Sequence, residues 1–395
     1  MMDANKVKQL DDQYVMHTYK RNDLVLESGQ GMIAKDPAGN EYLDFTSGIG
    51  VTCLGYCDPD WAAAVAKQAG TLQHTSNLFY TEPCALLAEK LCKATGFDKV
   101  FFANSGAEAN EGAIKAARKY SYDKYGAERN VVISLVNSFH GRTMATLTAT
   151  GQDVFHNYFG PFNEGFVYVP ANDLEALKKA LAGNKVCAVM MEMVQGEGGV
   201  MALDKEYVAA AAELCHSQDV LVVVDEVQTG MGRTGTLFAY QQFGIMPDII
   251  SMAKGLGGGL PIGGVAVSAA VAAGMGPSSH GSTFGGNPVV CAGANVVVDK
   301  LLAPGFLQNV NERAAQLRAG VAKLPHVTEV SGLGLMVGIA FEETVKAADV
   351  LAAAREKGLL CLTAKTRLRL LPPLILTEAD VEKALQILGD VLKAM

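Results

Sequence analysis

Short apolar runs alternate with stretches of helical period through the middle of this chain, and the alternation restricts the possible folds more than any other feature. The apolar runs predict strands over residues 100–103, 131–136, 186–190, 220–224 and 249–252. Helical periods lie at 107–120, 174–182 and 206–217. Strands joined through helices are connected by crossovers, which produce a mostly parallel sheet covered on both faces. The sequence therefore predicts an α/β fold.

Both ends of the chain depart from this alternation. The opening segment predicts strands at 24–27, 32–34 and 42–45, with a turn at 37–40. The C-terminal part begins with a predicted helix at 289–302 and continues with helix, two strands near 329–341, helix, a strand near 367–371 and a last helix at 378–392. We expect this part to form a separate α+β lobe.

Composition and charge exclude several classes of protein. Apolar residues make up 49% of the 395 residues and charged residues 19%, which favours a large folded core. The formal net charge is −8 and no cluster of Lys and Arg is present, which argues against nucleic acid or an anionic membrane as a partner. The longest apolar runs, such as 220–224, fall far below the ~18 residues needed to span a bilayer.

The N-terminal residues and the cysteines indicate a cytoplasmic protein. Residues 1–12 mix acids and bases and contain no apolar segment of the kind that marks a secretory signal. The eight cysteines include no C-x-x-C pair and no neighbouring cluster of histidines. We expect them to be reduced, with no structural metal and no disulfide framework.

Two strand-to-helix junctions carry residues that could do chemistry. At the first, the strand at 100–103 leads into Ser105-Gly106-Ala107, which opens a helix. Its unpaired N–H groups and dipole suit a phosphate, but Ser105 with Glu108 also forms an ordinary capping box that needs no ligand. At the second, Lys254 follows the strand at 249–252 and precedes a run of glycines. Lys254 is either a surface lysine or a desolvated amine able to form an imine.

An acidic residue gives these junctions a joint meaning. Asp225 ends the apolar strand at 220–224 and is either a helix cap or a functional carboxylate. An amine, an anion pocket and an acid that keeps a pyridine nitrogen protonated are the three groups that pyridoxal phosphate needs. The Walker spacing is not met, so a nucleotide P-loop is disfavoured.

Six motifs occur in the order found in the class III aminotransferases, which the chain resembles over nearly its whole length. They are Asn104 to Asn110, Ser138 to Thr143, Glu192 to Gly199, Asp225 to Gly230, Lys254 to Gly259 and His280 to Pro288. Within the class the sequence is most similar to the acetylornithine aminotransferases, whose Gly-Arg-Thr-Gly, Leu-Phe-Ala-Tyr and Lys-Gly-Leu-Gly-Gly-Gly stretches recur at 232–235, 237–240 and 254–259.

The resemblance implies a fold type I pyridoxal-phosphate enzyme. Its large cofactor-binding domain is expected at 58–288, with a small α+β domain built from 289–395 and the N-terminal segment 1–57. Lys254 and Asp225 are the implied catalytic residues, Lys254 as the imine-forming amine and Asp225 as the partner of the pyridine nitrogen. The implied cofactor contacts are Ser105, Gly106, Ala107, Phe139, Glu192, Asp225, Val227, Gln228, Lys254, Ser282 and Thr283.

The resemblance also implies the assembly and the substrates. Thr283 would reach the phosphate of the other subunit, so a homodimer with shared sites is expected. Arg142 would bind the carboxylate remote from the amine, and Arg369 would bind the α-carboxylate of glutamate. Glu197 would pair with Arg369 while the remote amine reacts, and Tyr19 could touch the substrate amine. No metal is implied.

The implied reaction moves the δ-amino group of N-acetylornithine to 2-oxoglutarate, in arginine synthesis. Relatives that act on succinylornithine, ornithine or 4-aminobutyrate share this machinery. Ile49 stands where ornithine δ-aminotransferases generally have an aromatic residue, which argues against free ornithine. A decarboxylase, mutase or racemase on the same scaffold, or a binding module without activity, are the alternatives of other classes.

Overall fold

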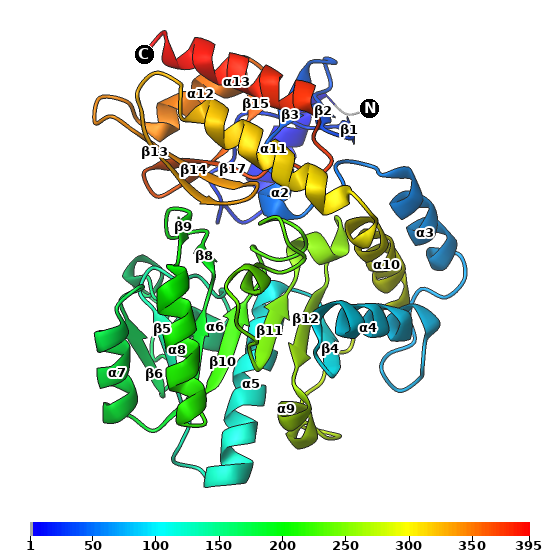
Figure 1. The fold of residues 1–395 in the computed structure, drawn as a ribbon. Helices are drawn as coiled ribbons and strands as arrows, with labels where there is room; N and C mark the ends of the chain where they lie inside the picture. Colours follow the sequence, from blue (N-terminus) through cyan, green and yellow to red (C-terminus); the bar gives the residue numbers. More distant parts are fainter. Residues whose placement is uncertain (1–2) are drawn as a thin grey trace.

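The computed structural model describes residues 3–395, so the first two residues of the predicted segment 1–57 lie outside it. Two lobes are visible, with a large sheet in the lower one (Figure 1). The sheet has the order β4-β12-β11-β10-β7-β5-β6. Its strands are β4 (Lys99–Ala103), β12 (Gly263–Val267), β11 (Ile249–Met252), β10 (Leu221–Asp225), β7 (Val186–Met191), β5 (Val131–Leu135) and β6 (Phe166–Val169).

The predicted parallel arrangement is confirmed for the centre of this sheet. β10 pairs in parallel with β7 and β11, and β5 pairs in parallel with β6 and β7. β12 was not predicted, and it is antiparallel to both of its neighbours, β11 and β4. Its sequence, Gly-Gly-Val-Ala-Val, begins with two glycines and is too short to show a period.

Strand β10 is buried on both faces, which explains its continuous apolar sequence. Leu221 and Val223 belong to the core that α5 (Gly106–Tyr125) shares with the sheet. Val222 and Val224 belong to the larger core on the opposite face, together with residues of α8 (Lys205–Ser217). Alternate side chains therefore hold the sheet between two layers of helices. The other helices of this lobe are α4 (Glu82–Thr95), α6 (Met144–Ala149), α7 (Leu174–Gly183) and α9 (Ala269–Gly274).

The upper lobe combines residues from both ends of the chain. β13 (Val327–Leu333), β14 (Met336–Phe341), β17 (Arg367–Leu370) and β16 (Leu362–Ala364) form one antiparallel sheet. β1 (Ser28–Gln30), β2 (Ile33–Lys35) and β3 (Glu41–Asp44) form another, and β15 (Leu359–Leu360) pairs in parallel with β3. The helices of this lobe are α11 (Phe306–Val321), α12 (Ala347–Glu356) and α13 (Glu378–Leu392).

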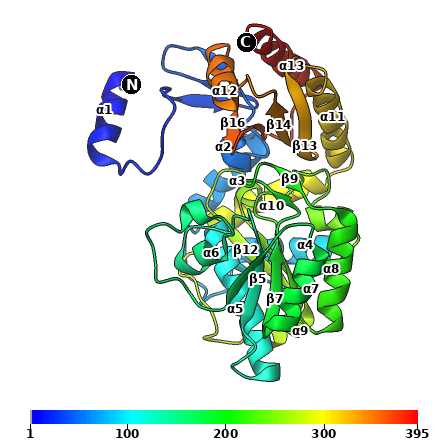
Figure 2. The same ribbon diagram turned by 90° about the vertical axis from the view of Figure 1, so that its left-hand side faces the viewer.

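The N-terminal region differs from expectation. The strand predicted at 24–27 is wrong, because only Glu27 makes a ladder bond, from its N–H to the Lys35 carbonyl, and β1 begins at Ser28. Helix α1 (Ala4–Tyr14) was not predicted, buries no residue and stands away from the upper lobe (Figure 2). Helix α10 (Pro288–Leu302) packs on α3 (Pro59–Ala69) and α4.

No single helix within residues 3–395 has the length and apolar composition needed to cross a membrane. Helices α10 and α11 have that length and composition only when they are taken together, and the two helices are bent by 72° relative to each other.

Candidate active site

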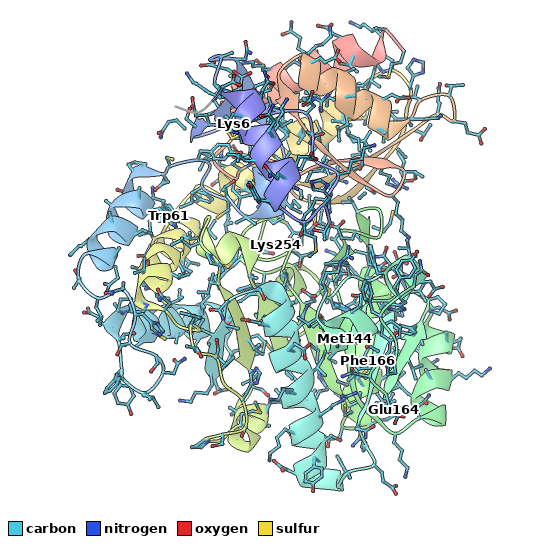
Figure 3. All side chains as sticks on the ribbon, turned by 180° about the vertical axis from the view of Figure 1, so that it is seen from behind. Lys6, Trp61, Met144, Glu164, Phe166 and Lys254 are labelled. Carbon is cyan, nitrogen blue, oxygen red and sulfur yellow. The ribbon has the colours of Figure 1, made fainter. Side chains whose placement is uncertain are left out.

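A cavity of about 460 Å³ opens at the carboxyl ends of the sheet strands. Figure 3 shows Lys254 at the upper end of the large sheet, where the two lobes meet. Open α/β sheets bind ligands at this edge. Ten of the residues expected at the site line the cavity: Ser105, Gly106, Ala107, Phe139, Arg142, Glu192, Asp225, Val227, Gln228 and Lys254.

Lys254 is the first residue of a short 3₁₀ turn, Lys254–Gly257, that follows β11. Its backbone is left-handed (φ 44°), which is uncommon for a residue with a side chain and marks a position determined by its surroundings. The pKa of its ammonium group is lowered to about 8, mainly by burial and also by the nearby Arg369 guanidinium, while Glu197 and Asp225 oppose the change. Lys254 therefore provides an amine that loses its proton near neutral pH.

This pKa predicts how the protein reacts with an aldehyde cofactor. Only the neutral amine is a nucleophile, so the rate at which cofactor-free protein takes up pyridoxal phosphate should rise with pH through about 8 and then level off. Stopped-flow absorbance at a series of pH values measures this rate. A rate that keeps rising up to the ordinary lysine pKa of about 10.4 would contradict the lowered value.

Asp225 is held at the end of β10 by three donors. The Val227 N–H donates to Oδ1 at 2.9 Å. Asn110 Nδ2 and His140 Nδ1 donate to Oδ2 at 2.7 and 2.8 Å. The carboxylate is buried. A carboxyl group fixed by three hydrogen bonds therefore lies at one wall of the cavity.

The N-terminus of α5 forms another wall. Ser105 is the helix cap, and its hydroxyl accepts the Glu108 N–H at 3.1 Å, so the cap is confirmed. The reciprocal bond of a capping box is not formed, because the Glu108 carboxylate accepts the Asn104 N–H at 2.6 Å instead. The cap leaves the N–H groups of Gly106 and Ala107 next to the cavity, so the capping and anion-binding interpretations are compatible. A Cβ atom at Gly106 would lie 2.6 Å from Val227 Cγ1, which excludes any larger residue there.

The buried Arg369 and the partly buried Glu197 form an ion pair beside Gln228. Arg369 Nη1 donates to Glu197 Oε1 at 2.6 Å and to Gln228 Oε1 at 3.2 Å. Burial opposes ionisation of Glu197, but the Arg369 charge outweighs it and holds the pKa of the carboxyl below its ordinary value. The Arg369 Nε is buried without a hydrogen-bond partner among residues 3–395. The guanidinium is thus occupied by Glu197 and retains an unused donor.

Glu192 lies deeper in the site. Its carboxyl accepts the Phe139 N–H at 3.1 Å. Burial, together with the negative charge of Asp225, raises the pKa of Glu192 well above its ordinary value. Both effects favour the neutral form of the Glu192 carboxyl, which holds the Phe139 backbone at the cavity.

Five expected residues do not line this cavity. Glu197 and Arg369 lie next to it, each hydrogen-bonded to Gln228, which is part of the lining. Tyr19 is exposed and lies outside it. Ser282 accepts a hydrogen bond from Asn104 Nδ2 at 3.1 Å, and Thr283 is exposed, but both belong to a loop beside a different cavity, of about 610 Å³. Within one chain, these residues contribute nothing to the wall.

Sequence reasoning missed the two side chains that hold Asp225. Asn110 and His140 lie within the first two of the six motifs, but neither motif predicted that its side chain would contact Asp225. Asn110 stands four residues after Gly106, on the same face of α5, and that spacing could have indicated it. No comparable signal exists for His140, because it lies 85 residues from Asp225 and only the fold brings them together.

These groups fit pyridoxal phosphate. One cavity holds a free amine of lowered pKa, a carboxylate fixed by three donors and a helix N-terminus with open N–H groups. This set suits an aldehyde, a protonated pyridine nitrogen and a phosphate.

Comparisons with known proteins agree with this reading. The family model for aminotransferase class-III matches residues 14–392. The chain belongs to the class-III aminotransferases, a family that depends on pyridoxal phosphate. It is 55% identical to an acetylornithine aminotransferase of Haemophilus ducreyi, over all of both chains. It is 44% identical to one of Methanocaldococcus jannaschii, covering 97% of this chain and 96% of the other.

Solved structures show the same similarity. An N-acetylornithine aminotransferase of Stenotrophomonas maltophilia superposes with a TM-score of 0.84 at 39% identity, covering 98% of both chains. An ornithine aminotransferase of Toxoplasma gondii has a TM-score of 0.95 at 33% identity, covering 100% of this chain and 96% of the other. A further structure of the Toxoplasma gondii enzyme is described with partial occupancy of the cofactor at the active site.

Proposed function

We propose that this chain transfers the δ-amino group of N-acetylornithine to 2-oxoglutarate, giving N-acetylglutamate semialdehyde and glutamate, a step of arginine biosynthesis. The observation that carries the proposal is the pair of arginines at the site, Arg142 exposed and Arg369 paired with Glu197. Two carboxylate sites, one of them closed by an acid, suit two unlike amines. The curated relatives named above support the same activity.

The residues around the cavity have distinct roles in this proposal. The N–H groups of Gly106 and Ala107 would hold the cofactor's phosphate, and Phe139 and Val227 would lie on either side of its ring. Bound pyridoxal phosphate supplies an aldehyde for the amine and a ring that withdraws electrons from the reacting carbon. Asp225 is placed to keep the ring nitrogen protonated, and Lys254 Nζ can accept the proton that leaves the amine-bearing carbon of the substrate.

The two substrates differ in where their carboxylates lie. N-Acetylornithine carries its carboxylate several bonds from the reacting amine, whereas glutamate carries one next to it. A free cation beside the cofactor would therefore suit glutamate and repel the other amine's approach. While N-acetylornithine reacts, Glu197 neutralises Arg369 through the 2.6 Å ion pair. When glutamate binds, Glu197 moves aside and Arg369 binds the carboxylate next to the reacting amine.

Replacing Glu197 by alanine should shift the preference of the enzyme towards α-amino donors. The variant leaves Arg369 permanently free, and a charged hydrogen bond of about 1.5–3 kcal/mol corresponds to roughly 10- to 100-fold in rate ratio. Single-turnover rates with N-acetylornithine and with glutamate measure the ratio. Glu197→Gln is the matched control, because it keeps hydrogen bonding without the charge. An equal change in both half-reactions would show that Glu197 is not a switch.

One assay tests the activity as a whole. Purified holoenzyme is given 2-oxoglutarate and a panel of amines: N-acetylornithine, succinylornithine, ornithine and 4-aminobutyrate. Glutamate formation is the readout. N-Acetylornithine is expected to have the highest kcat/KM. A higher value for another amine would reassign the substrate, and release of CO₂ without glutamate would instead indicate a decarboxylase.

We also propose a homodimer with shared sites in a reducing, cytoplasmic compartment. A cluster of exposed apolar side chains, Leu72, Leu78, Phe79, Tyr80 and Phe284, is a surface that a second copy could cover. The same surface includes the Ser282–Thr283 loop, which would then contribute to the neighbouring site. All eight cysteines are free in the structure, and a reducing compartment would keep them so. Analytical ultracentrifugation of the holoenzyme tests the assembly.

A further inference from the structure

Arg142 is held in an unusual way for a charged side chain at a site. No hydrogen bond or ion pair to another residue in 3–395 involves its guanidinium. Its contacts are aromatic: the guanidinium carbon lies 4.1 Å from the centre of the Phe155 ring and 5.5 Å from that of Phe139. The two rings meet edge to face, with their centres 5.7 Å apart. The guanidinium of this exposed arginine therefore lies against the Phe155 ring, while its N–H donors carry no hydrogen bond to residues 3–395.

Phe155 is positioned by the residues on both sides of it. It ends the 3₁₀ turn Asp153–Phe155. Before the turn, Gln152 Nε2 donates to the Ser138 carbonyl at 3.0 Å. After it, His156 Nε2 lies 2.9 Å from the Leu147 carbonyl of α6. The neighbouring Val154 and Tyr158 are 66% and 86% exposed, whereas Phe155 is more buried than either of them. The loop thus directs one aromatic ring, and no other, at Arg142.

A cation on an aromatic face and a carboxylate in the guanidinium plane do not compete for the same atoms. The π face of the aromatic ring attracts the charge of the guanidinium. The N–H donors at the edge of the guanidinium keep the fork geometry that matches a carboxylate. When a flexible arginine binds a carboxylate, part of the binding free energy is lost, because ordering its long side chain costs entropy. An arginine held flat in advance loses less on binding.

We propose that Phe155 is a positioning and specificity-determining residue. Its ring holds the Arg142 guanidinium so that the site selects amines that carry a carboxylate remote from the reacting nitrogen. This inference rests on the proposed function, since it assigns Arg142 to the remote carboxylate of N-acetylornithine. Phe155 acts through Arg142 and is itself no part of the reacting groups.

A merely structural role for Phe155 predicts a different result. If Phe155 only supported Phe139, its loss would weaken cofactor binding and slow every amine alike. If it holds Arg142, its loss affects only ligands with the remote carboxylate. The two cases can be told apart by comparing a substrate that carries the remote carboxylate with one that lacks it.

The experiment compares N-acetyl-L-ornithine with N-acetylputrescine, which is the same molecule without the carboxylate. In holoenzyme carrying Phe155→Leu, the ratio of their kcat/KM values should fall about tenfold, mainly through the KM of N-acetylornithine. Phe155→Tyr keeps the ring and should keep the ratio. Tyr158→Leu, which removes an exposed aromatic side chain from the same loop, should leave the ratio unchanged. Calorimetry with N-acetyl-L-norvaline, which has the carboxylate but no δ-amine, should show about tenfold weaker binding to Phe155→Leu.

Each outcome decides the matter. An unchanged ratio in Phe155→Leu, or an equal loss for both amines, would overturn the role of Phe155 while leaving the proposed function intact. If the parent enzyme itself made no distinction between the two amines, the proposed function would fail first and this inference with it. If Phe155→Leu does not fold, loss of the carboxylate preference in Phe155→Tyr would still overturn the proposal, since that variant retains the ring.

Discussion

Replacing Lys254 by alanine is expected to lower turnover with N-acetylornithine by at least about 10⁴-fold, the scale found when a group that acts directly in the chemistry is removed. Lys254 is the only lysine that lines the cavity within residues 3–395. The other cation there, Arg142, cannot replace it, because a guanidinium does not lose its proton in proteins. The variant loses both the nucleophile and the proton acceptor.

The covalent attachment gives a readout that does not depend on activity. After borohydride treatment and proteolysis, mass spectrometry should find the cofactor on the peptide that contains Lys254 in the parent protein and on no peptide of Lys254→Ala. Lys365→Ala is a matched control, since Lys365 is also a lysine with a left-handed backbone (φ 52°) but is exposed. It should behave as the parent. Attachment of the cofactor to a different lysine would show that the nucleophile has been misassigned.

Five of the seven strands of the large sheet could be predicted, because burial on both faces leaves a direct trace in the sequence. The edge strand β6 was not predicted, and only the last of its four residues is fully buried. β11 was predicted with its observed bounds, and the runs at β4, β5, β7 and β10 were placed within one residue at each end. β12 left no such trace, because its glycines permit a close approach of the neighbouring chain and carry no hydrophobic signal. The boundaries at residues 57 and 288 stay predictions.

The site was predictable in its residue types and less so in its contacts. A lysine, an acid and a helix start at three strand ends are local features, and parallel strands bring their carboxyl ends to one edge. The ion pair of Arg369 with Glu197 joins residues 172 positions apart, and only the resemblance indicated it. Phe155 lies outside every motif, and its contact with Arg142 depends on a loop conformation that no sequence period encodes. The roles of Tyr19 and Thr283 stay predictions.

Asp225 is the second group whose removal should have a large effect. Asp225→Ala is expected to reduce turnover by about 100- to 1,000-fold, as other single electrostatic groups do. The carboxylate matters most when negative charge develops on the reacting carbon and is drawn towards the ring, so the chemical step should slow more than substrate binding weakens. Covalent attachment through Lys254 should persist, because that amine lies on a different strand end.

The neighbouring acid provides the control for this prediction. Glu226 is buried beside Asp225, but its carboxyl bonds to Thr229 and to the Tyr240 N–H and does not line the cavity. Burial raises the pKa of Glu226 to about 7, so Glu226→Gln replaces a group that is already partly neutral near that pH and should change turnover by less than about threefold. Pre-steady-state rates of Asp225→Ala, Asp225→Asn and Glu226→Gln should therefore separate clearly. Near-normal turnover in Asp225→Ala would mean that another residue faces the pyridine nitrogen, and Glu192, the other acid lining the cavity, would be tested next.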